Sequence, residues 1–488
     1  MVASLTLLYV VAVLKTSRRF VWFDELYTLD IAKAKTIPQI WQLIGRFDFQ
    51  PLTGYLFTRF SMALFGQSPF GLRFPSMLEF YVGSMALFFY VRRKVGISYA
   101  AAAILILWLG ATFRYATEAR PYALLMASFS TLLLCWDIAT TSEKRALAIG
   151  GVALSNLAML SAHIFAPLSL FPFLAAEVAR FSRTRKTDFV LWAALLVPTA
   201  AMVLYIPLLK GAGSLYFPTE FQASLGKIIH FYLDSINIIS VALLLALCAA
   251  LIISQTQQWG VGVSVRGWRR EEIVLLGLIL LNPILLNIVL RWRHGAFWDR
   301  YTITTRAVIY IGMAILLGLR LLQNHRAGYA AAAILLVFCV RTDVSGPSSS
   351  PVKDASALAA IRSDLPLVDA GAVTFFEMNH HEKPDILSRL YFLKDRSLAM
   401  SYTNTNIFED RGWGDKMKPD FPISATVSPY KNFIHQHREF LVLGTYDAPE
   451  EWLLRKLHDD GARLTWLGAY PLPYVDSDLY LVSQPAAN

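Results

Sequence analysis

Acidic and cationic residues lie directly beside long apolar runs at several separated points of the sequence. Asp24 and Glu25 occur in FVWFDELYTLD, and Glu118 and Arg120 occur in YATEARPYALL. A carboxylate can move a proton, and an arginine presents a fork of donors that matches a phosphate or another anion. These residues predict proton transfer beside an anionic ligand. The candidate substrate-binding residues are Glu25, Arg120, Tyr122, His163 in SAHIFAP, and Arg300 with Tyr301 in FWDRYTITT.

Each candidate also has a plainer interpretation. A charged side chain at the end of a membrane span can simply be solvated or can snorkel to the interface. Pro121 suits the first turn of a helix, so Tyr122 can be an interfacial tyrosine. His163 can be a hydrogen-bonded packing residue, a donor-binding residue or, together with Glu118, a ligand of a divalent metal. No second histidine at ligand spacing supports a metal site. The sequence therefore predicts no certain cofactor and leaves a divalent metal open.

The composition indicates which elements must position these residues. Of the 488 residues 55% are hydrophobic and 16% are charged, which predicts an integral membrane protein rather than a soluble domain. A membrane-spanning helix needs about 20 mainly apolar residues. Such windows recur along the chain, and we expect a polytopic α-helical protein with about eleven spans. The expected spans are residues 1–14, 74–91, 97–113, 121–140, 146–162, 164–179, 189–209, 236–254, 273–290, 302–319 and 328–340.

The loops between the spans predict the orientation. If the N-terminus is cytoplasmic, every loop predicted inside is basic, as the positive-inside rule requires. The candidate residues then fall on the outer side, where charges at span ends tend to line cavities or substrate paths. Cations that also fall outside indicate an anionic ligand there, although lipid headgroups would serve equally well. These outer cations are Lys15, Arg18, Arg19, Arg291, Arg293 and Arg300; the inside loops contain RRK (92–94), SEKR (142–145), RFSRTRK (180–186), RGWRR (266–270) and RLLQNHR (320–326).

Two stretches of the first outer loop are predicted to be interfacial helices rather than spans. Residues 36–46 repeat apolar residues at helical spacing behind Thr36, a candidate N-cap, and carry Pro38 in the first turn. Residues 52–65 are too short for a span and contain Arg59. Counting them as a span would also move the basic loops to the outside.

The composition changes near residue 342, where a stretch rich in Ser, Pro and Gly predicts a linker. We therefore expect a membrane domain over residues 1–341 and a small soluble α/β domain over residues 342–488 on the outer side. His380 and His381 are expected to be solvated there. Strand-like and helix-like runs alternate in this domain. The expected strands are 370–377, 439–446, 462–470 and 478–483, and the expected helices are 354–365 and 449–460.

Several motifs resemble, in order and at similar spacing, those of a known enzyme family. WFDELYTLDIA, QPLTGYLF, GQSPFGLRFPS and YATEARPYALL are similar to segments of the GT-C type membrane glycosyltransferases of the protein O-mannosyltransferase and lipid A aminoarabinose-transferase superfamily. The bacterial members with an E-A-R-P-Y motif are the most similar. The resemblance covers residues 1–200 and extends loosely to Arg300 and Tyr301. Where many members read P-P-L-Y, this chain reads Q-P-L-T, which bears on specificity rather than on class.

The resemblance implies a transferase that takes its sugar, a hexose or a pentose, from a polyprenyl-phosphate donor. The active site would face the periplasmic or extracellular side of a bacterial inner membrane that the protein crosses many times. Asp24 matches the family's first-loop acid, which acts at the reaction centre, and Glu118 matches its second-loop acid. The family also has two or three interfacial helices in the first outer loop. The implied acceptor is a lipid, a cell-envelope glycan or a protein, and membrane lipid surrounds the enzyme.

Transfer from such a donor places two demands on the site. The anomeric carbon loses phosphate in an oxocarbenium-like state while an acceptor hydroxyl attacks from the opposite face, so the configuration is inverted. A general base, usually worth about 10²–10⁴ in rate, must take the hydroxyl proton, and cations must neutralise the departing phosphate. We expect Asp24 to be this base, with Glu25 either orienting it or merely solvated. Arg300, Arg120 and Tyr301 are the expected phosphate-binding residues, and Lys15, Arg18 and Arg19 are weaker candidates.

Other function classes compete with this one. A transporter or flippase for lipid-linked sugars would also have many spans, but its ionisable residues should lie near the bilayer midplane. A non-catalytic assembly subunit would tolerate the change Asp24→Asn. Nucleic-acid binding is disfavoured despite a net charge of +10, because the Lys and Arg residues mostly lie in short loops between spans. Glu79, Asp137, Glu177 and Arg306 lie within spans and are left unassigned.

Overall fold

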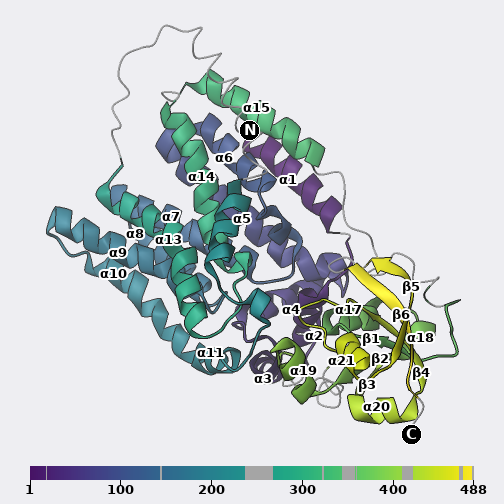
Figure 1. Cartoon of the computed structure of the whole chain (residues 1–488). Coiled ribbons are helices and arrows are strands. Elements are labelled where there is room, and N and C mark those ends of the chain that lie inside the picture. The colour runs from purple at the N-terminus through teal and green to yellow at the C-terminus, as the bar shows by residue number, and fades with distance from the viewer. Residues whose placement is uncertain are drawn as a thin grey trace.

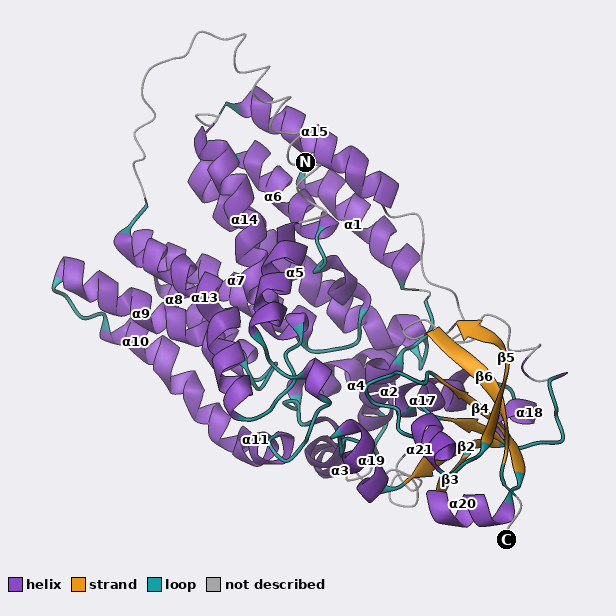
Figure 2. Cartoon of the chain, in the orientation of Figure 1, coloured by secondary structure: helices purple, strands orange, loops and turns teal. Residues whose placement is uncertain are grey.

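The chain forms a helical part, residues 1–342, and a C-terminal unit of strands and helices that follows it (Figure 1). The computed structural model describes residues 1–17, 19–142, 145–236, 268–320, 324–342, 358, 360–408, 421–471 and 476–485. Figure 2 shows that the strands of this described chain all belong to the C-terminal unit. The predicted domain boundary at 341/342 borders a stretch outside the description, so it stays a prediction.

A helix covers every expected span except 236–254, which lies almost entirely outside the described residues. Five described stretches are long and apolar enough to cross a membrane: Pro69–Val95, Tyr122–Thr141, Phe189–Ala212, Arg270–Trp292 and Asp299–Leu319. The expected total of eleven spans therefore stays a prediction. The main helices are α1 (Val2–Thr16), α5 (Pro69–Val95), α6 (Ile97–Leu109), α7 (Tyr122–Thr141), α8 (Arg145–Leu160), α9 (Ala166–Thr184), α10 (Phe189–Leu196) with its continuations η3 (Val197–Tyr205) and α11 (Ile206–Ala212), α13 (Arg270–Trp292), α14 (Ile303–Arg320) and α15 (His325–Thr342). The short turns η2 (Phe113–Thr117), η4 (Thr219–Phe221) and η5 (Asp299–Thr302) lie between them.

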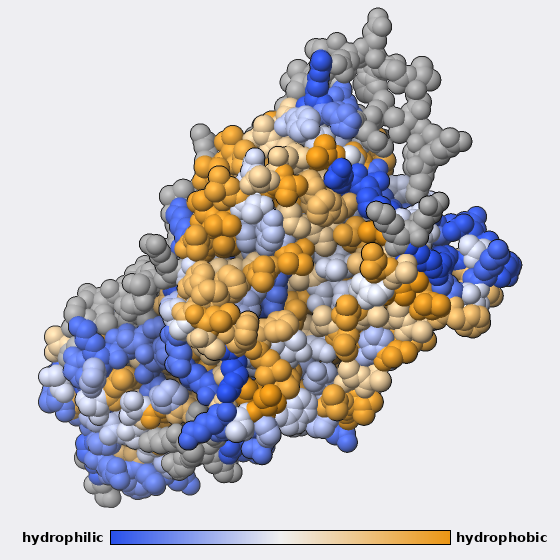
Figure 3. Space-filling view, turned by 180° about the vertical axis from the view of Figure 1, so that it is seen from behind, coloured by the Kyte–Doolittle hydropathy of each residue, from blue (hydrophilic) through white to orange (hydrophobic). Residues whose placement is uncertain are grey.

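Apolar side chains cover much of the outer surface of the helical part. Leu7, Leu154 and Ile288 are 66%, 71% and 61% exposed although each lies on a long helix. Figure 3 shows such hydrophobic residues spread over the helical part, and hydrophilic residues over the C-terminal unit at the lower left. Apolar patches this extensive are not stable against water, and they fit a lipid environment.

The loops that the sequence predicts inside gather at one end of the helical part. Asp137 on α7 accepts hydrogen bonds from Arg93 at 2.7 Å and Lys94 at 2.8 Å, which lie in the last turn of α5. It also accepts from Arg269, before α13, at 3.1 Å, and Arg269 pairs with Glu272 at 2.7 Å. Asp137 thus pairs with cations at this end of the helical part and not with the other residues that the sequence left unassigned. Further pairs at this end are Arg180–Glu177, Arg180–Asp188, Arg183–Glu271 and Arg145–Asp188.

The first loop, residues 17–68, folds into short helices as the sequence predicted. Thr36 caps one of them by accepting a hydrogen bond from the Gln39 N–H at 3.3 Å, with Pro38 in the first turn. The predicted helices at 36–46 and 52–65 are confirmed. The elements of this loop are α2 (Phe23–Ala32), α3 (Ile37–Leu43), η1 (Ile44–Asp48) and α4 (Thr53–Phe65).

The C-terminal unit is built on a six-stranded sheet with the order β3-β2-β1-β4-β6-β5. The strands β3, β2, β1 and β4 run parallel, whereas β6 and β5 join the sheet antiparallel. The strands are β1 (Leu367–Asp369), β2 (Leu390–Lys394), β3 (Thr426–Pro429), β4 (Glu439–Gly444), β5 (Arg463–Pro471) and β6 (Asp476–Ser483). The helices are α17 (Ala372–His381), α18 (Pro384–Leu387), α19 (Arg396–Thr403), α20 (Tyr430–Gln436) and α21 (Leu453–Asp459).

One expected strand of this unit is wrong. The stretch 370–377 does not form a strand, because β1 ends at Asp369 and residues from Ala372 onward form α17. The Asp369 carboxylate accepts hydrogen bonds from the Gly371 N–H at 2.9 Å and the Thr374 hydroxyl at 2.7 Å. Such local bonds from an aspartate turn the chain out of the sheet and start the helix.

The other expectations for the C-terminal unit fare better. The strands expected at 439–446, 462–470 and 478–483 correspond to β4, β5 and β6, and the helix expected at 449–460 corresponds to α21. The strands β2 and β3 were not expected. The helix expected at 354–365 begins outside the described residues, and residues 361–364 form a turn.

The C-terminal unit packs against the first loop. Tyr27 of α2 and Phe376 of α17 belong to one continuous hydrophobic cluster, together with Phe47 of η1. His381 was expected to be solvated, but it is only partly exposed and its Nε2 lies 2.7 Å from the carbonyl oxygen of Val21. His380 is exposed, as expected. The unit therefore contacts the segment in which the candidate acids lie.

Candidate active site

Glu25 anchors the beginning of α2 and is fully buried. Its carboxylate accepts hydrogen bonds from Arg73 of α5 at 2.8 and 2.5 Å and from the Ala119 N–H at 2.8 Å. Arg73 is also fully buried and donates to three backbone carbonyls in residues 17–20 at 2.7 to 2.8 Å. The expectation that Glu25 could be a solvated acid is therefore wrong, because its oxygens are fixed inside the protein. The Glu25–Arg73 ion pair therefore fixes the backbone next to Asp24.

Asp24 points toward η5, where it meets Arg300. The Asp24 Oδ2 lies 2.8 Å from the Arg300 Nη1, and the two side chains are 15% and 18% exposed. The guanidinium also lies near the rings of Trp22, Tyr122 and Trp298, at 5.8, 5.7 and 5.3 Å from their centroids. These cation–π contacts limit how the guanidinium can turn. The structure thus brings together the first-loop acid and the arginine that precedes α14.

Arg120 forms a second ion pair, with Asp48 at the end of η1. Two N–H···O bonds of 2.6 and 2.8 Å join the guanidinium to the carboxylate, and the Tyr55 hydroxyl donates to the same carboxylate. Arg120 also donates to the backbone carbonyl of Asp24 at 3.2 Å and is only 7% exposed. Both terminal nitrogens of its guanidinium therefore donate to residues of the first loop. In this structure Arg120 holds the backbone of Asp24 through the Asp24 carbonyl oxygen. The sequence predicted instead that Arg120 binds a phosphate.

A cavity of about 390 Å³ opens beside Arg300. We call it the cationic cavity, because Arg19, Arg114 and Lys227 add three more cations to its wall. Glu118, the second predicted catalytic acid, lies in the same wall. Arg300 therefore connects the two acids, since it pairs with Asp24 and shares the cavity with Glu118. The wall consists of Arg19, Trp22, Arg114, Glu118, Lys227, His230, Phe297, Trp298, Asp299 and Arg300.

The two acids in this wall do not cancel its positive charge. Asp299 forms an ion pair with Arg306 at 2.6 Å. Arg306, which the sequence analysis left unassigned, also pairs with Asp234 at 2.8 Å. Glu118 is 4% exposed, and its Oε1 has no hydrogen-bond partner among the described residues. Burial raises the pKa of Glu118 to about 7, although nearby arginines lower it. A large share of Glu118 is therefore neutral at pH 7, and the cavity favours an anion.

Tyr122, His163 and Tyr301 form an aromatic cluster next to Arg300. The His163 ring lies 5.6 Å from Tyr122 and 5.3 Å from Tyr301, measured between ring centroids. Its Nδ1 accepts a hydrogen bond from the Phe165 N–H at 3.2 Å. Burial, together with the charges of nearby arginines, lowers the pKa of His163 to about 3, so the ring is neutral. Across the described chain no group of three or more His, Cys, Asp or Glu residues could hold a metal ion.

Sequence reasoning missed Asp48, Arg73 and Arg114 as members of this site. Each lies within or directly beside a quoted motif: Arg73 in GQSPFGLRFPS, Asp48 just before QPLTGYLF, and Arg114 just before YATEARPYALL. Their position in or beside these motifs was the signal that could have identified them as site residues. Among the weaker cation candidates, Arg19 lines the cationic cavity and Lys15 does not, whereas Arg18 lies outside the described residues.

The fold is similar to that of two solved structures of one enzyme. The first is ArnT from Cupriavidus metallidurans bound to undecaprenyl phosphate, with a TM-score of 0.53, 12% identity and coverage of 98% of this chain and 97% of that chain. The second is the same enzyme in the apo state, with a TM-score of 0.52, 11% identity and the same coverage. ArnT is an aminoarabinose transferase of the GT-C type. Neither a family profile nor a curated protein sequence matches the chain. At this identity the likeness establishes a shared fold over nearly the whole chain.

Proposed function

We propose that this protein is a membrane glycosyltransferase that transfers a sugar from a polyprenyl-phosphate donor to an acceptor hydroxyl. The observation that carries the proposal is the Asp24–Arg300 ion pair at the edge of a cationic cavity. A base and a phosphate-binding cation are the two groups that this reaction needs. The shared fold with an enzyme that binds undecaprenyl phosphate, and the similar motifs in the sequence, support the same function.

The donor phosphate would bind in the cationic cavity. Arg300, Arg19 and Arg114 offer forked donors that match phosphate oxygens, and Lys227 adds a point charge. Because Glu118 is partly neutral near pH 7, it adds little repulsion toward the phosphate. The same cations would neutralise the charge that develops as the phosphate leaves the sugar.

Asp24 would act as the general base. A phosphate that takes up the Arg300 donors frees the Asp24 carboxylate to accept the proton of the acceptor hydroxyl. That hydroxyl then attacks the anomeric carbon on the face opposite the phosphate, which inverts the configuration. Arg120 and Asp48 would keep the Asp24 backbone in place, since Arg120 donates to the Asp24 carbonyl. Tyr122, His163 and Tyr301 would form the aromatic wall behind the donor.

The active-site end would face the periplasmic or extracellular side, with the C-terminal unit on that side. The basic loops support this orientation, because they gather at the other end around Asp137. Charges at the helix ends support an enzyme over a transporter, whose coupling site would lie at the midplane. The acceptor is a lipid, a glycan or a protein, and the proposal assigns no step to a metal.

A panel of radiolabelled polyprenyl-phosphate hexoses and pentoses tests this function. Purified protein is incubated with each donor and a membrane extract that supplies acceptors, and the released polyprenyl phosphate is measured. We expect at least one donor to be consumed by the natural protein and not by Asp24→Asn. The matched control is Asp385→Asn, because it makes the same chemical change at an exposed residue that does not line the cavity. Consumption of no donor, or equal consumption by Asp24→Asn, would overturn the proposal.

A further inference from the structure

The helix α17 of the C-terminal unit makes two polar contacts with the chain around Asp24. The Glu377 Oε1 accepts a hydrogen bond from the Phe23 N–H at 2.8 Å. The His381 Nε2 lies 2.7 Å from the Val21 carbonyl oxygen, within hydrogen-bond distance. These contacts fix the backbone at two of the three residues that precede Asp24. Both come from a helix that is more than three hundred residues away in the sequence.

Aromatic packing joins the same two segments. Phe376 stacks on Tyr27 with ring centroids 5.4 Å apart and an interplanar angle of 23°. Phe23 packs edge-on against Phe376 at 5.9 Å, and Phe20 packs edge-on against His381 at 5.8 Å. Aromatic pairs of this kind contribute about 0.5–1.5 kcal/mol each beyond their buried area. The contact is therefore a packed interface around the two polar contacts.

The Glu377 contact caps the N-terminal end of α2. Phe23 is the first residue of this helix, and the first N–H groups of a helix have no partner inside the helix itself. Glu377 supplies that partner from outside the helical part. The side chain is 1% exposed, and its Oε2 has no hydrogen-bond partner in the described chain. Burying a carboxyl group costs free energy unless the group is hydrogen-bonded. The hydrogen bond that Glu377 accepts comes from the residue next to Asp24.

We propose that α17 is a positioning helix for the catalytic base, and that Glu377 and His381 hold residues 21–23 so that the Asp24 carboxylate stands against Arg300. This inference rests on the proposed function of Asp24. It gives the C-terminal unit a role in the transfer step, in addition to any role in acceptor binding. Neither Glu377 nor His381 is among the residues that line the cationic cavity, and their hydrogen-bond contacts go to Phe23 and Val21, so they act through α2 and are not catalytic residues themselves.

The protonation state of Glu377 suggests the most informative variant. Burial, together with the charges of Asp369, Asp24 and Glu25, raises the pKa of Glu377 to about 8, although the Phe23 hydrogen bond acts to lower it. The side chain is therefore mostly neutral at pH 7. Glutamine has the same shape and the same neutral oxygen acceptor. Glu377→Gln should keep the contact to Phe23, and Glu377→Ala should remove it.

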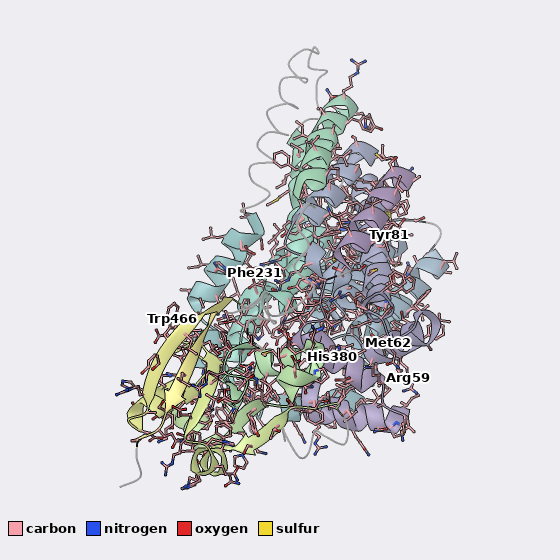
Figure 4. All side chains as sticks on the ribbon, turned by 90° about the vertical axis from the view of Figure 1, so that its right-hand side faces the viewer. Arg59, Met62, Tyr81, Phe231, His380 and Trp466 are labelled. Carbon is pink, nitrogen blue, oxygen red and sulfur yellow. The ribbon has the colours of Figure 1, made fainter. Side chains whose placement is uncertain are left out.

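The test compares four full-length variants in lipid nanodiscs, using the polyprenyl-phosphate sugar that the natural protein consumes. For Glu377→Ala and His381→Ala we expect kcat to fall roughly 10- to 100-fold, the range for a displaced catalytic group. The Kd for undecaprenyl phosphate should stay within about threefold, because the cavity is untouched. Glu377→Gln should restore kcat to within about threefold of the natural protein. His435→Ala on α20 is the matched control, because it removes an exposed histidine of the same unit, whereas His380, labelled in Figure 4, packs edge-on against His381 at 4.8 Å.

Hydrogen exchange on the same proteins separates this inference from the proposed function. Glu377→Ala should speed amide exchange in residues 21–26 and leave α7 unchanged, whether or not transfer is measured. If the natural protein consumes no donor, the proposed function fails while the exchange result still decides whether α17 holds α2. Exchange and kcat like those of the natural protein in both alanine variants would overturn the inference. A uniform loss of thermal stability that Glu377→Gln does not rescue would also overturn it, because it would indicate a purely structural contact.

Discussion

Arg300 is the residue that links the two halves of the candidate site. It pairs with Asp24 and also forms part of the cavity wall that contains Glu118. Asp24 and Arg300 come from opposite ends of the helical part of the sequence, so no spacing in the sequence predicts their contact. What the sequence predicts is that both lie at outer ends of spans. The direct partners, 2.8 Å apart, come only from the folded chain.

Two replacements of Arg300 should distinguish the contribution of its charge to phosphate binding from the contribution of its forked, planar shape. Arg300→Lys keeps the positive charge but loses the fork and the flat face that contacts Trp22 and Trp298. We expect the Kd for undecaprenyl phosphate to rise about 10-fold, and Arg300→Gln to raise it more, consistent with about 1.5–3 kcal/mol for a bond to a charged group. Titration with the lipid phosphate measures both. An unchanged Kd in Arg300→Gln would remove this residue from the phosphate site.

Glu118 predicts how binding depends on pH. Its folded-state pKa of about 7 lies above the usual value for glutamate, because burial disfavours the charged form. The neutral form dominates below about pH 7, so lipid phosphate should bind more tightly there and more weakly as the pH rises through 7. Glu118→Gln should weaken this dependence between pH 6 and about 8, where the second ionisation of the lipid phosphate, with a pKa of about 6, still contributes. The measurement is the Kd across that range in both proteins, and the same pH dependence in Glu118→Gln as in the natural protein would contradict the assignment.

The same pKa sets the sign of the effect of Glu118 on stability. The folded protein binds this proton more tightly than the unfolded chain does. The contribution of Glu118 is thus fully present below the unfolded pKa of about 4 and is lost as the pH rises toward 7.

At the scale of elements, the first loop is held by two buried ion pairs. Glu25–Arg73 fastens α2 to α5, and Asp48–Arg120 fastens η1 to the start of α7. The helices of this loop were predictable, since Thr36 and Pro38 are local signals. The pairs were not, because both partners in each are far apart in the sequence. Local signals also misled at 370–377, where Val, Thr and Phe favour a strand but the Asp369 hydrogen bonds begin a helix.

Removing one partner of the Glu25–Arg73 pair should damage folding more than chemistry. Both side chains are fully buried, so Arg73→Ala leaves an uncompensated buried carboxylate. We expect a loss of about 3–5 kcal/mol in the free energy of unfolding. Thermal unfolding in detergent, followed by tryptophan fluorescence, measures it. The surface change Arg362→Ala, at a pair that is 43% and 66% exposed, is the control and should cost less than about 1 kcal/mol. Equal effects of the two changes would contradict the role of Arg73.

At the scale of the whole molecule, charge and hydropathy separate into zones. Basic loops surround Asp137 at one end, apolar side chains cover the helices, and the cationic cavity lies at the other end beside the C-terminal unit. The sequence predicted this layout through the positive-inside pattern, because orientation depends on summed charge and not on individual contacts. The contact between α17 and α2 could not be predicted from the sequence, because packing between distant segments leaves no periodic pattern in it.

This layout predicts the sidedness of two exposed positions. Asp385→Cys in the C-terminal unit should react with a membrane-impermeant maleimide in spheroplasts, and Ser182→Cys at the end of α9 should react only after the membrane is opened. The three natural cysteines are first replaced by serine. Labelling of Ser182→Cys in intact spheroplasts, with Asp385→Cys protected, would reverse the proposed orientation.

The most direct test of the account is a single-turnover transfer by the Asp24→Asn protein with donor already bound. Asparagine keeps the size of the side chain but cannot take a proton, and it releases the Arg300 donors toward the phosphate. We predict that undecaprenyl phosphate binds at least as tightly as it does to the natural protein, while transfer slows by about 10²–10⁴. Transfer at the natural rate by Asp24→Asn would contradict the assignment of Asp24 as the base.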